Sequence, residues 1–183
     1  MRIHSDRSLE PAQYERRGLE EIVGIVVHRI EVSQEDPGYQ DSVTDTIRFF
    51  REHEIGVRAT GGAMPYPILV LKTGEVVQTL PLNRVTPHAK AHNPTTIGVA
   101  CIGDFRDSSP SEEQYQGLVL TCASLLNQLS LGVEVLVAHD ELTGGSSDPD
   151  KECPGRGLCM DALRREIKVA LKIGNLVSFS CAD

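Results

Sequence analysis

The chain has no hydrophobic run long enough to cross a membrane. None of its 183 residues belongs to a segment that approaches the roughly 18 consecutive apolar residues of a membrane-spanning helix. The start of the chain, MRIHSDRSLE, carries charges but no apolar core, so it lacks the pattern of a signal peptide. From these two absences we expect a protein that does not insert into membranes and that either is made in the cytoplasm or has had its leader removed.

A surplus of basic residues is also absent. Lys and Arg together number 18 against 26 Asp and Glu, which gives a formal net charge of −8 at pH 7. Nucleic acids and anionic lipid surfaces are bound through basic surfaces, so we expect neither of them as a partner. The acidity itself favours solubility and indicates no particular partner.

Cysteines are few, and none occurs in residues 1–100. The five cysteines are Cys101, Cys122, Cys153, Cys159 and Cys181. An odd number at scattered spacings is no disulfide framework and fits a reducing compartment. Internal repeats and low-complexity segments are absent too. The length fits one domain that buries a substantial core, and we expect a monomer.

The chain does contain alternating strand and helix patterns. They predict the α/β class, as a single domain with a central mixed β-sheet flanked by helices. Strands are predicted for the apolar, β-branched runs at residues 22–28, 66–71, 75–80, 97–102 and 135–139. Helices are predicted for residues 44–53, for a segment that opens at 109–113 and runs through 129, and for 160–173. We expect an N-terminal arm at residues 1–20, the domain at 21–175 and a C-terminal tail at 176–183.

Two histidines directly follow apolar strand patterns, His28 and His139. A polar side chain at the C-terminal end of such a strand projects into the crevice where α/β sheets bind ligands. Cys153 lies in a polar loop beside Lys151, an environment that favours a thiolate. Two imidazoles and a thiolate give three ligands to a tetrahedral zinc and leave the fourth position open for water. The set predicts a hydrolytic zinc enzyme with its metal in a cleft at the strand ends.

Other interpretations of these residues stay open at this point. Either histidine alone is more often an ordinary residue at a strand end, and only the set of three favours a metal. His88 and His92 flank Ala-Lys-Ala in a loop and could be metal ligands, groove residues or neither. A metal pair made by Cys153 and Cys159 is disfavoured, because its spacing is looser than that of structural zinc knuckles and no second pair exists.

Six stretches of the chain carry a resemblance to a known family. They are Ile25–His28, Tyr66–Gln78, Asn83–Asn93, Thr96–Phe105, Val137–His139 and Lys151–Gly155. In this order, over about residues 20–172, they resemble the type 2 zinc-dependent N-acetylmuramoyl-L-alanine amidases, whose superfamily includes phage lysozymes with amidase activity and peptidoglycan recognition proteins. The resemblance implies hydrolysis of the amide between N-acetylmuramic acid and L-alanine in peptidoglycan. Such an enzyme, for example a phage endolysin, acts on the cell wall after release or export.

The resemblance also implies a role for each matched residue. The implied zinc ligands are His28, His139 and Cys153. The implied catalytic side chains are Tyr66 and Lys151. His88 and Asn93 match positions that line the groove for glycan and peptide.

Three positions depart from the family pattern. Arg29 and Pro67 stand where many members have histidines, and Ala100 stands where one branch has a catalytic glutamate. The branch that uses tyrosine and lysine remains intact, so the pattern predicts a catalytic member of that branch. The alternative is a recognition module that binds peptidoglycan without cutting it. Cys153 argues against this alternative, because non-catalytic relatives typically lose that ligand.

Overall fold

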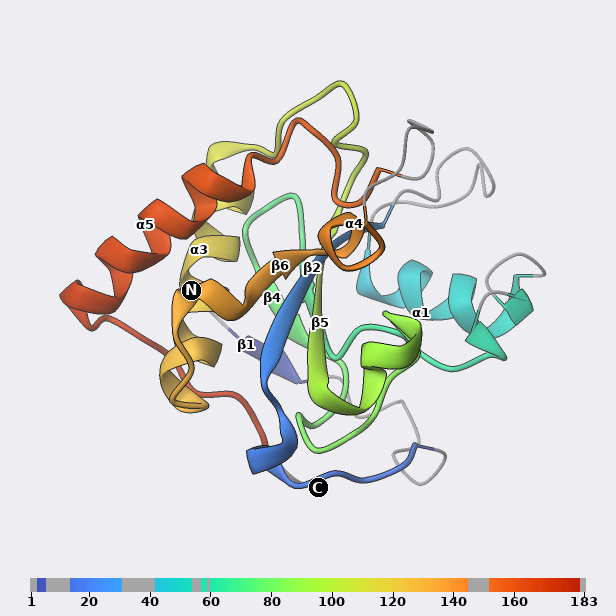
Figure 1. Cartoon of the computed structure of the whole chain (residues 1–183). Helices are drawn as coiled ribbons and strands as arrows, with labels where there is room; N and C mark the ends of the chain where they lie inside the picture. Colours follow the sequence, from blue (N-terminus) through green and yellow to red (C-terminus); the bar gives the residue numbers. More distant parts are fainter. Residues whose placement is uncertain are drawn as a thin grey trace.

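The computed structural model describes residues 3–5, 14–30, 42–53, 57, 58, 60–144 and 152–181 (Figure 1). This part of the chain forms one six-stranded sheet in the order β1-β4-β3-β5-β2-β6. The strands are β1 (Ile3–Ser5), β2 (Gly24–Ile30), β3 (Ile68–Val70), β4 (Val76–Gln78), β5 (Thr96–Ile102) and β6 (Leu136–Ala138). All neighbouring strands are parallel except β3 and β4, which form the predicted hairpin. The predicted α/β class with a mixed sheet is confirmed.

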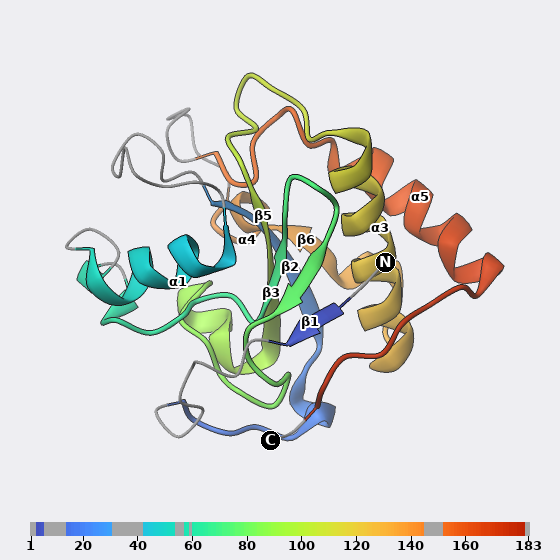
Figure 2. The same ribbon diagram turned by 180° about the vertical axis from the view of Figure 1, so that it is seen from behind.

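Helices cover both faces of the sheet. The α-helices are α1 (Val43–Glu52), α3 (Glu112–Gln128), α4 (His139–Leu142) and α5 (Met160–Ile173). Short 3-10 helices are η2 (Leu19–Glu21), η3 (Lys90–Thr95) and η4 (Val133–Val135). Helices α3 and α5 pack together on one face, and α1 lies on the other (Figures 1 and 2). None of these described helices is long and apolar enough to span a bilayer.

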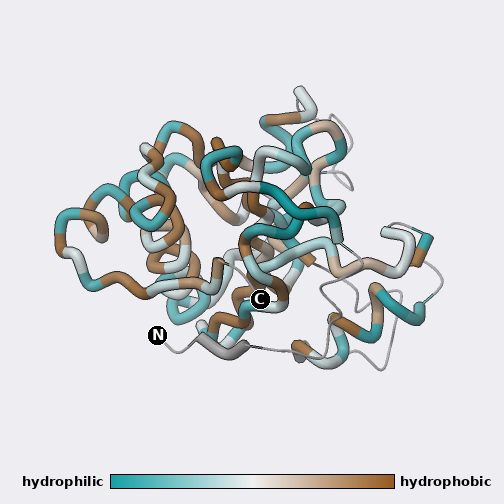
Figure 3. The backbone as a smooth tube through the Cα atoms, turned by 90° about the horizontal axis from the view of Figure 1, so that it is seen from below, coloured by the Kyte–Doolittle hydropathy of each residue, from teal (hydrophilic) through white to brown (hydrophobic). Residues whose placement is uncertain are grey.

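Local sequence signals determine where the main helices begin and end. The hydroxyls of Ser42 and Ser111 accept hydrogen bonds from the first-turn amides of Asp45 and Gln114, each at 3.1 Å, so they cap α1 and α3. Gly174 ends α5 with a φ of 75°, a conformation that glycine adopts without a steric penalty. Apolar and polar residues alternate along the helices (Figure 3), as expected for helices with one face on the core.

The two central strands are buried along their whole length. Every residue of β5 is buried, and every residue of β2 is buried except Arg29, which is partly exposed. Parallel strands covered on both faces are usually continuous hydrophobic runs. His28 interrupts such a run with only 1% of its surface exposed. A polar ring in this position requires hydrogen-bond partners, and these lie at the candidate site.

The segments on either side of the predicted domain contact its body. Strand β1 pairs with β4 at the edge of the sheet. The buried guanidinium of Arg17 donates to four backbone carbonyls, those of Leu82, Asn93, Pro94 and Thr96. At the other end, the carbonyl oxygen of Ser180 accepts a hydrogen bond from the amide of Leu82. The boundaries at residues 21 and 175 stay a prediction, but described residues of both flanks bond to the body of the domain.

Candidate metal centre

The pairing of two strands brings the two predicted histidine ligands together. In the parallel pair β2 and β6, Val27 is opposite Ala138, so the residues that follow them, His28 and His139, lie at the same level. Their ring centroids are 4.6 Å apart. His28 does not end its strand as predicted, because β2 continues through Ile30. His139 begins α4 directly after β6.

Cys153 joins the two histidines from the loop before α5. Its Sγ atom lies 3.7 Å from Nδ1 of His28. One ligand atom from each of His28, His139 and Cys153 can be chosen so that all three lie within 4.8 Å of one another. Donors bound to one tetrahedral zinc at 2.0–2.3 Å lie about 3.5 Å apart, so this spacing fits a single ion after small adjustments. The donor set, two imidazoles and one thiol, is also one that zinc prefers.

Two hydrogen bonds hold the cysteine loop against the histidine-bearing elements. The amide of Asp140 in α4 donates to the carbonyl oxygen of Cys153 at 3.0 Å. Nε of Arg29, the residue after His28, donates to the carbonyl oxygen of Glu152 at 3.0 Å. Each bond therefore links the immediate chain neighbour of one ligand to the loop that carries Cys153.

Burial keeps the two histidines neutral, which is the form that binds a metal. The pKa of His28 lies well below its usual value because the ring is buried, and repulsion from the protonated forms of His88 and His139 acts in the same direction. Burial is also the main reason that the pKa of His139 is lowered. Both imidazoles therefore have an unprotonated nitrogen at neutral pH.

Cys153 differs from the expectation of a thiolate. Burial raises the pKa of its thiol to about 11, although the amide and the charge of Arg29 act in the opposite direction. Without a metal the thiol is protonated at neutral pH, and a bound cation replaces that proton. The polar loop sequence predicted a solvated environment, whereas the thiol of Cys153 lies against the buried ring of His28.

Tyr66 lies beside the cluster, in the segment before β3. Its ring centroid is 5.0 Å from that of His28, and the ring of Phe50 packs edge-on against its other side at 5.9 Å. Burial, together with the negative charge of the Cys153 thiolate form, raises the pKa of Tyr66. The phenol is therefore protonated at neutral pH and can donate a hydrogen bond. Lys151, the other predicted catalytic residue, lies outside the described residues.

The two predicted groove residues make hydrogen bonds within the protein. His88 is 7% exposed, and its Nδ1 lies 3.1 Å from Nε2 of His28. Burial lowers the pKa of His88 to about 4, so its ring is neutral. Oδ1 of Asn93 accepts hydrogen bonds from the amides of His88 and Ala89 at 3.0 and 2.6 Å. Their roles in substrate binding stay predictions.

Sequence analysis missed the ion pairs that support the cysteine loop. Nη1 of Arg29 lies 2.7 Å from Oδ1 of Asp104, and Arg106 binds both oxygens of the same carboxylate. The sequence signals Arg29 only as a departure from the family pattern and does not signal Asp104. Cys159, which the sequence disfavoured as a ligand, is exposed and lies outside the one group of possible metal ligands found among the described residues.

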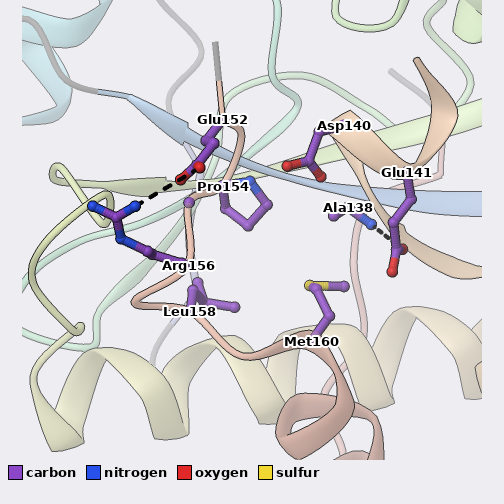
Figure 4. A pocket seen from close by; sticks show the side chains of 9 residues that line it. Ala138, Asp140, Glu141, Glu152, Pro154, Arg156, Leu158 and Met160 are labelled. Carbon is purple, nitrogen blue, oxygen red and sulfur yellow. Dashed lines mark hydrogen bonds and ion pairs between the residues drawn. The ribbon is translucent and has the colours of Figure 1, made fainter. Parts of the chain in front are cut away.

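A pocket of about 290 Å³ opens beside the cluster (Figure 4). It is lined by the chain neighbours of two ligands and by the start of α5, namely Ala138, Asp140, Glu141, Glu152, Pro154, Gly155, Arg156, Leu158 and Met160. Three carboxylates surround it, and Leu158 and Met160 give it an apolar side. Arg156 lies 4.0 Å from the carboxylate of Glu152 at one edge. The pocket thus combines charged and apolar surface, and it is lined by chain neighbours of His139 and Cys153 but by none of the three candidate ligands themselves.

The fold and the three-ligand group define an α/β protein with a candidate metal centre where the strands β2 and β6 end. Residues 18–156 match the profile of the family described as N-acetylmuramoyl-L-alanine amidase. The chain belongs to this family, as its resemblance to the type 2 amidases predicted. No curated protein sequence matches the chain.

Solved structures share the fold over almost the whole chain. N-acetylmuramoyl-L-alanine amidase LysC from Clostridium intestinale URNW matches with a TM-score of 0.68 and 18% identity, over 92% of this chain and 98% of its own. The Ph2119 endolysin from the Thermus scotoductus MAT2119 bacteriophage Ph2119 matches with a TM-score of 0.66 and 23% identity, over 91% and 99%. Drosophila PGRP-LB matches with a TM-score of 0.62 and 17% identity, over 97% and 96%. At these identities the similarity shows the fold alone.

Proposed function

We propose that this protein is a zinc-dependent amidase that hydrolyses the amide between N-acetylmuramic acid and L-alanine of the peptidoglycan stem. The observation that carries the proposal is the convergence of His28, His139 and Cys153 within 4.8 Å in a chain of the amidase family. These three residues would hold the zinc. The ion would supply Lewis acidity, which activates a water molecule and polarises the scissile carbonyl.

Tyr66 and Lys151 are the proposed catalytic side chains. The position of Tyr66 beside His28 and the raised pKa of its phenol support a donor role. A protonated hydroxyl there would donate a hydrogen bond to the oxyanion of the tetrahedral intermediate. We propose from the family resemblance that Lys151 stabilises the negative charge of the same oxyanion. Loss of one such donor typically costs about 100- to 1,000-fold in rate.

The products of this reaction are defined by the bond that breaks. Water adds to the amide carbon, so the muramic acid side keeps a new carboxylate and L-alanine leaves with a free amine. The enzyme would act on the cell wall, as the endolysin and amidase names of its structural relatives suggest. Peptidoglycan is the proposed partner, and we expect the protein to act as a monomer.

Digestion of purified peptidoglycan, followed by mass spectrometry, tests the proposal. The expected product is free stem peptide that begins with L-alanine, and it should disappear when a chelator is added. The Cys153→Ser variant serves as the matched control. Cleavage within the glycan or inside the stem peptide would contradict the assignment.

The second candidate is a recognition module that binds peptidoglycan without cutting it. The observation that favours it is the fold match to the ectodomain complex of peptidoglycan recognition proteins LCa and LCx with bound tracheal cytotoxin, with a TM-score of 0.62 over 97% of this chain and 99% of that one. Co-sedimentation with cell walls, with no release of peptide by zinc-loaded protein, would support this candidate over the amidase.

A further inference from the structure

We propose that His88 is a positioning residue for His28. Its Nδ1 atom accepts a hydrogen bond from Nε2–H of His28 and thereby keeps Nδ1 of His28 unprotonated and directed toward Cys153. The inference deepens the proposed function, since it concerns a ligand of the proposed zinc site. It gives His88 a role behind the metal, in place of the groove contact that the family resemblance implies.

The two nitrogens of His28 have different neighbours. Nδ1 lies 3.7 Å from Sγ of Cys153, on the side of the ligand group. Nε2 lies 3.1 Å from Nδ1 of His88, with the two rings edge-on at 85°. A nitrogen that binds a metal carries no proton, so the proton of a neutral His28 has to be on Nε2.

The surroundings of His88 determine which of its own nitrogens is the acceptor. Nε2 of His88 lies 3.3 Å from both the carbonyl oxygen and the hydroxyl of Thr96. The carbonyl can only accept, and the hydroxyl donates its own proton to the carbonyl oxygen of His92 at 2.6 Å, so neither group donates to His88. The proton of His88 is therefore on Nε2, and Nδ1 is free to accept from His28. The Thr96 carbonyl also accepts a 2.7 Å hydrogen bond from Nη1 of Arg17. A chain of hydrogen bonds thus runs from Arg17 through Thr96 and His88 to His28.

Packing holds the His88 ring in place. A Cβ atom added to Gly98 would lie 2.9 Å from Cγ of His88, so the ring rests directly on the β5 backbone. Oδ1 of Asn93 binds the amide of His88 and keeps the backbone of the loop in position. Only 7% of His88 is exposed, which leaves little of its surface for a glycan or a peptide. These contacts fit a residue that acts through His28.

The first test needs no substitution and no metal. Two-dimensional ¹⁵N–¹H spectroscopy of imidazole nitrogens in the metal-free protein shows which nitrogen of each neutral histidine carries the proton. We expect the proton of His28 on Nε2 and that of His88 on Nε2. A proton on Nδ1 of His28 would overturn the inference. The result does not depend on amidase activity, so it stands or fails separately from the proposed function.

The second test compares two substitutions of His88. His88→Leu removes the acceptor, while His88→Asn places an amide oxygen close to the position of Nδ1. Loss of a partner behind a metal ligand typically weakens metal binding about 10- to 100-fold. We expect this loss for His88→Leu, with recovery to near wild-type zinc affinity for His88→Asn, measured by competition with a chromogenic chelator. His92→Leu, an exposed histidine on η3, is the matched control and should bind zinc normally.

The outcomes separate a positioning role from a purely structural one. The visible spectrum of the cobalt-substituted protein should change for His88→Leu and stay near wild type for His88→Asn, because it reports the ligand geometry. Wild-type zinc affinity in a folded His88→Leu protein would overturn the inference. If His88→Leu fails to fold, the His88→Asn variant and the protonation state of wild-type His28 still decide the question. If the wild-type protein binds no zinc, the proposed function fails, and the proton on His28 alone decides the inference.

Discussion

Replacing Arg29 by methionine removes the side chain that ties the cysteine loop to β2. Arg29 is 10% exposed and donates to the carbonyl oxygen of Glu152 at 3.0 Å and to Asp104 at 2.7 Å. Methionine retains much of the aliphatic stem but has no donor. A hydrogen bond from a charged group contributes about 1.5–3 kcal/mol, and a partly exposed ion pair adds up to about 1 kcal/mol. We therefore expect the free energy of unfolding to fall by about 2–4 kcal/mol.

Urea denaturation of the metal-free protein, followed by circular dichroism, measures this change directly. The Glu152 carbonyl directly precedes Cys153, so we also expect zinc affinity to fall by about 10-fold or more, the size seen when support of a metal ligand is lost. Arg156→Met is the matched control. Arg156 is 63% exposed and binds Asp107 and Glu152 on the same side of the molecule, so its loss should leave stability and zinc binding unchanged. Wild-type stability and zinc affinity in Arg29→Met would refute the reasoning.

Three further predictions address the cysteine ligand, the proposed hydrogen-bond donor Tyr66 and the ion pair of Asp104. Cys153→Ser should lose zinc, measured by atomic absorption, and keep a native circular dichroism spectrum. Cys159→Ser should keep its zinc, and zinc loss in this variant would show that the cysteine ligand has been misassigned. Tyr66→Phe should retain zinc and thermal stability but cleave peptidoglycan about 100-fold or more slowly, and an unchanged rate would exclude the hydroxyl from the chemistry. The pKa of Asp104 is lowered in the folded protein, chiefly by its hydrogen bond to Arg106. The ionised carboxylate therefore stabilises the fold fully above its unfolded pKa of 3.8, and this contribution is lost as the pH falls through the lower pKa of the folded protein. Asp104→Asn should therefore lower Tm at pH 7 and converge with wild type in acid; a constant difference would contradict this origin.

The features that the sequence predicts well are determined by residues that lie close together in the chain. Helix α5 has the predicted bounds because its apolar spacing stops just before Gly174, which adopts the left-handed conformation. The hairpin between β3 and β4 follows from a tight turn at Gly74, whose amide binds the carbonyl oxygen of Leu71. The convergence of His28 and His139 was also predictable, because each follows an apolar run and ligand-binding side chains gather toward the C-terminal ends of neighbouring parallel strands. The prediction was wrong only in placing His28 at the end of its strand, since β2 continues through Ile30.

Features that depend on distant contacts were not predictable. Strand β1, with the sequence Ile-His-Ser, has no apolar run and is defined only by its pairing with β4. His88 is 60 residues from His28 in the chain, and Arg29 is 123 residues from Glu152. No local pattern indicates which partner such a side chain will reach. The raised pKa of the Cys153 thiol also depends on distant contacts, because the thiol is buried by packing against the rest of the protein and not by the residues of its own loop.

These distant contacts also explain why the candidate site can exist before a metal binds. Each of the three ligands is held by a hydrogen bond that involves no ion. His28 binds His88. Beside Cys153, the carbonyl of Glu152 accepts from Arg29, and beside His139, the amide of Asp140 donates to the carbonyl of Cys153. In small zinc domains the metal supplies the folding energy, because no core exists without it. Here the ligands extend from a buried sheet and from a loop tied to it. A metal ion would therefore have only to displace the thiol proton of Cys153 and draw three nearby atoms together.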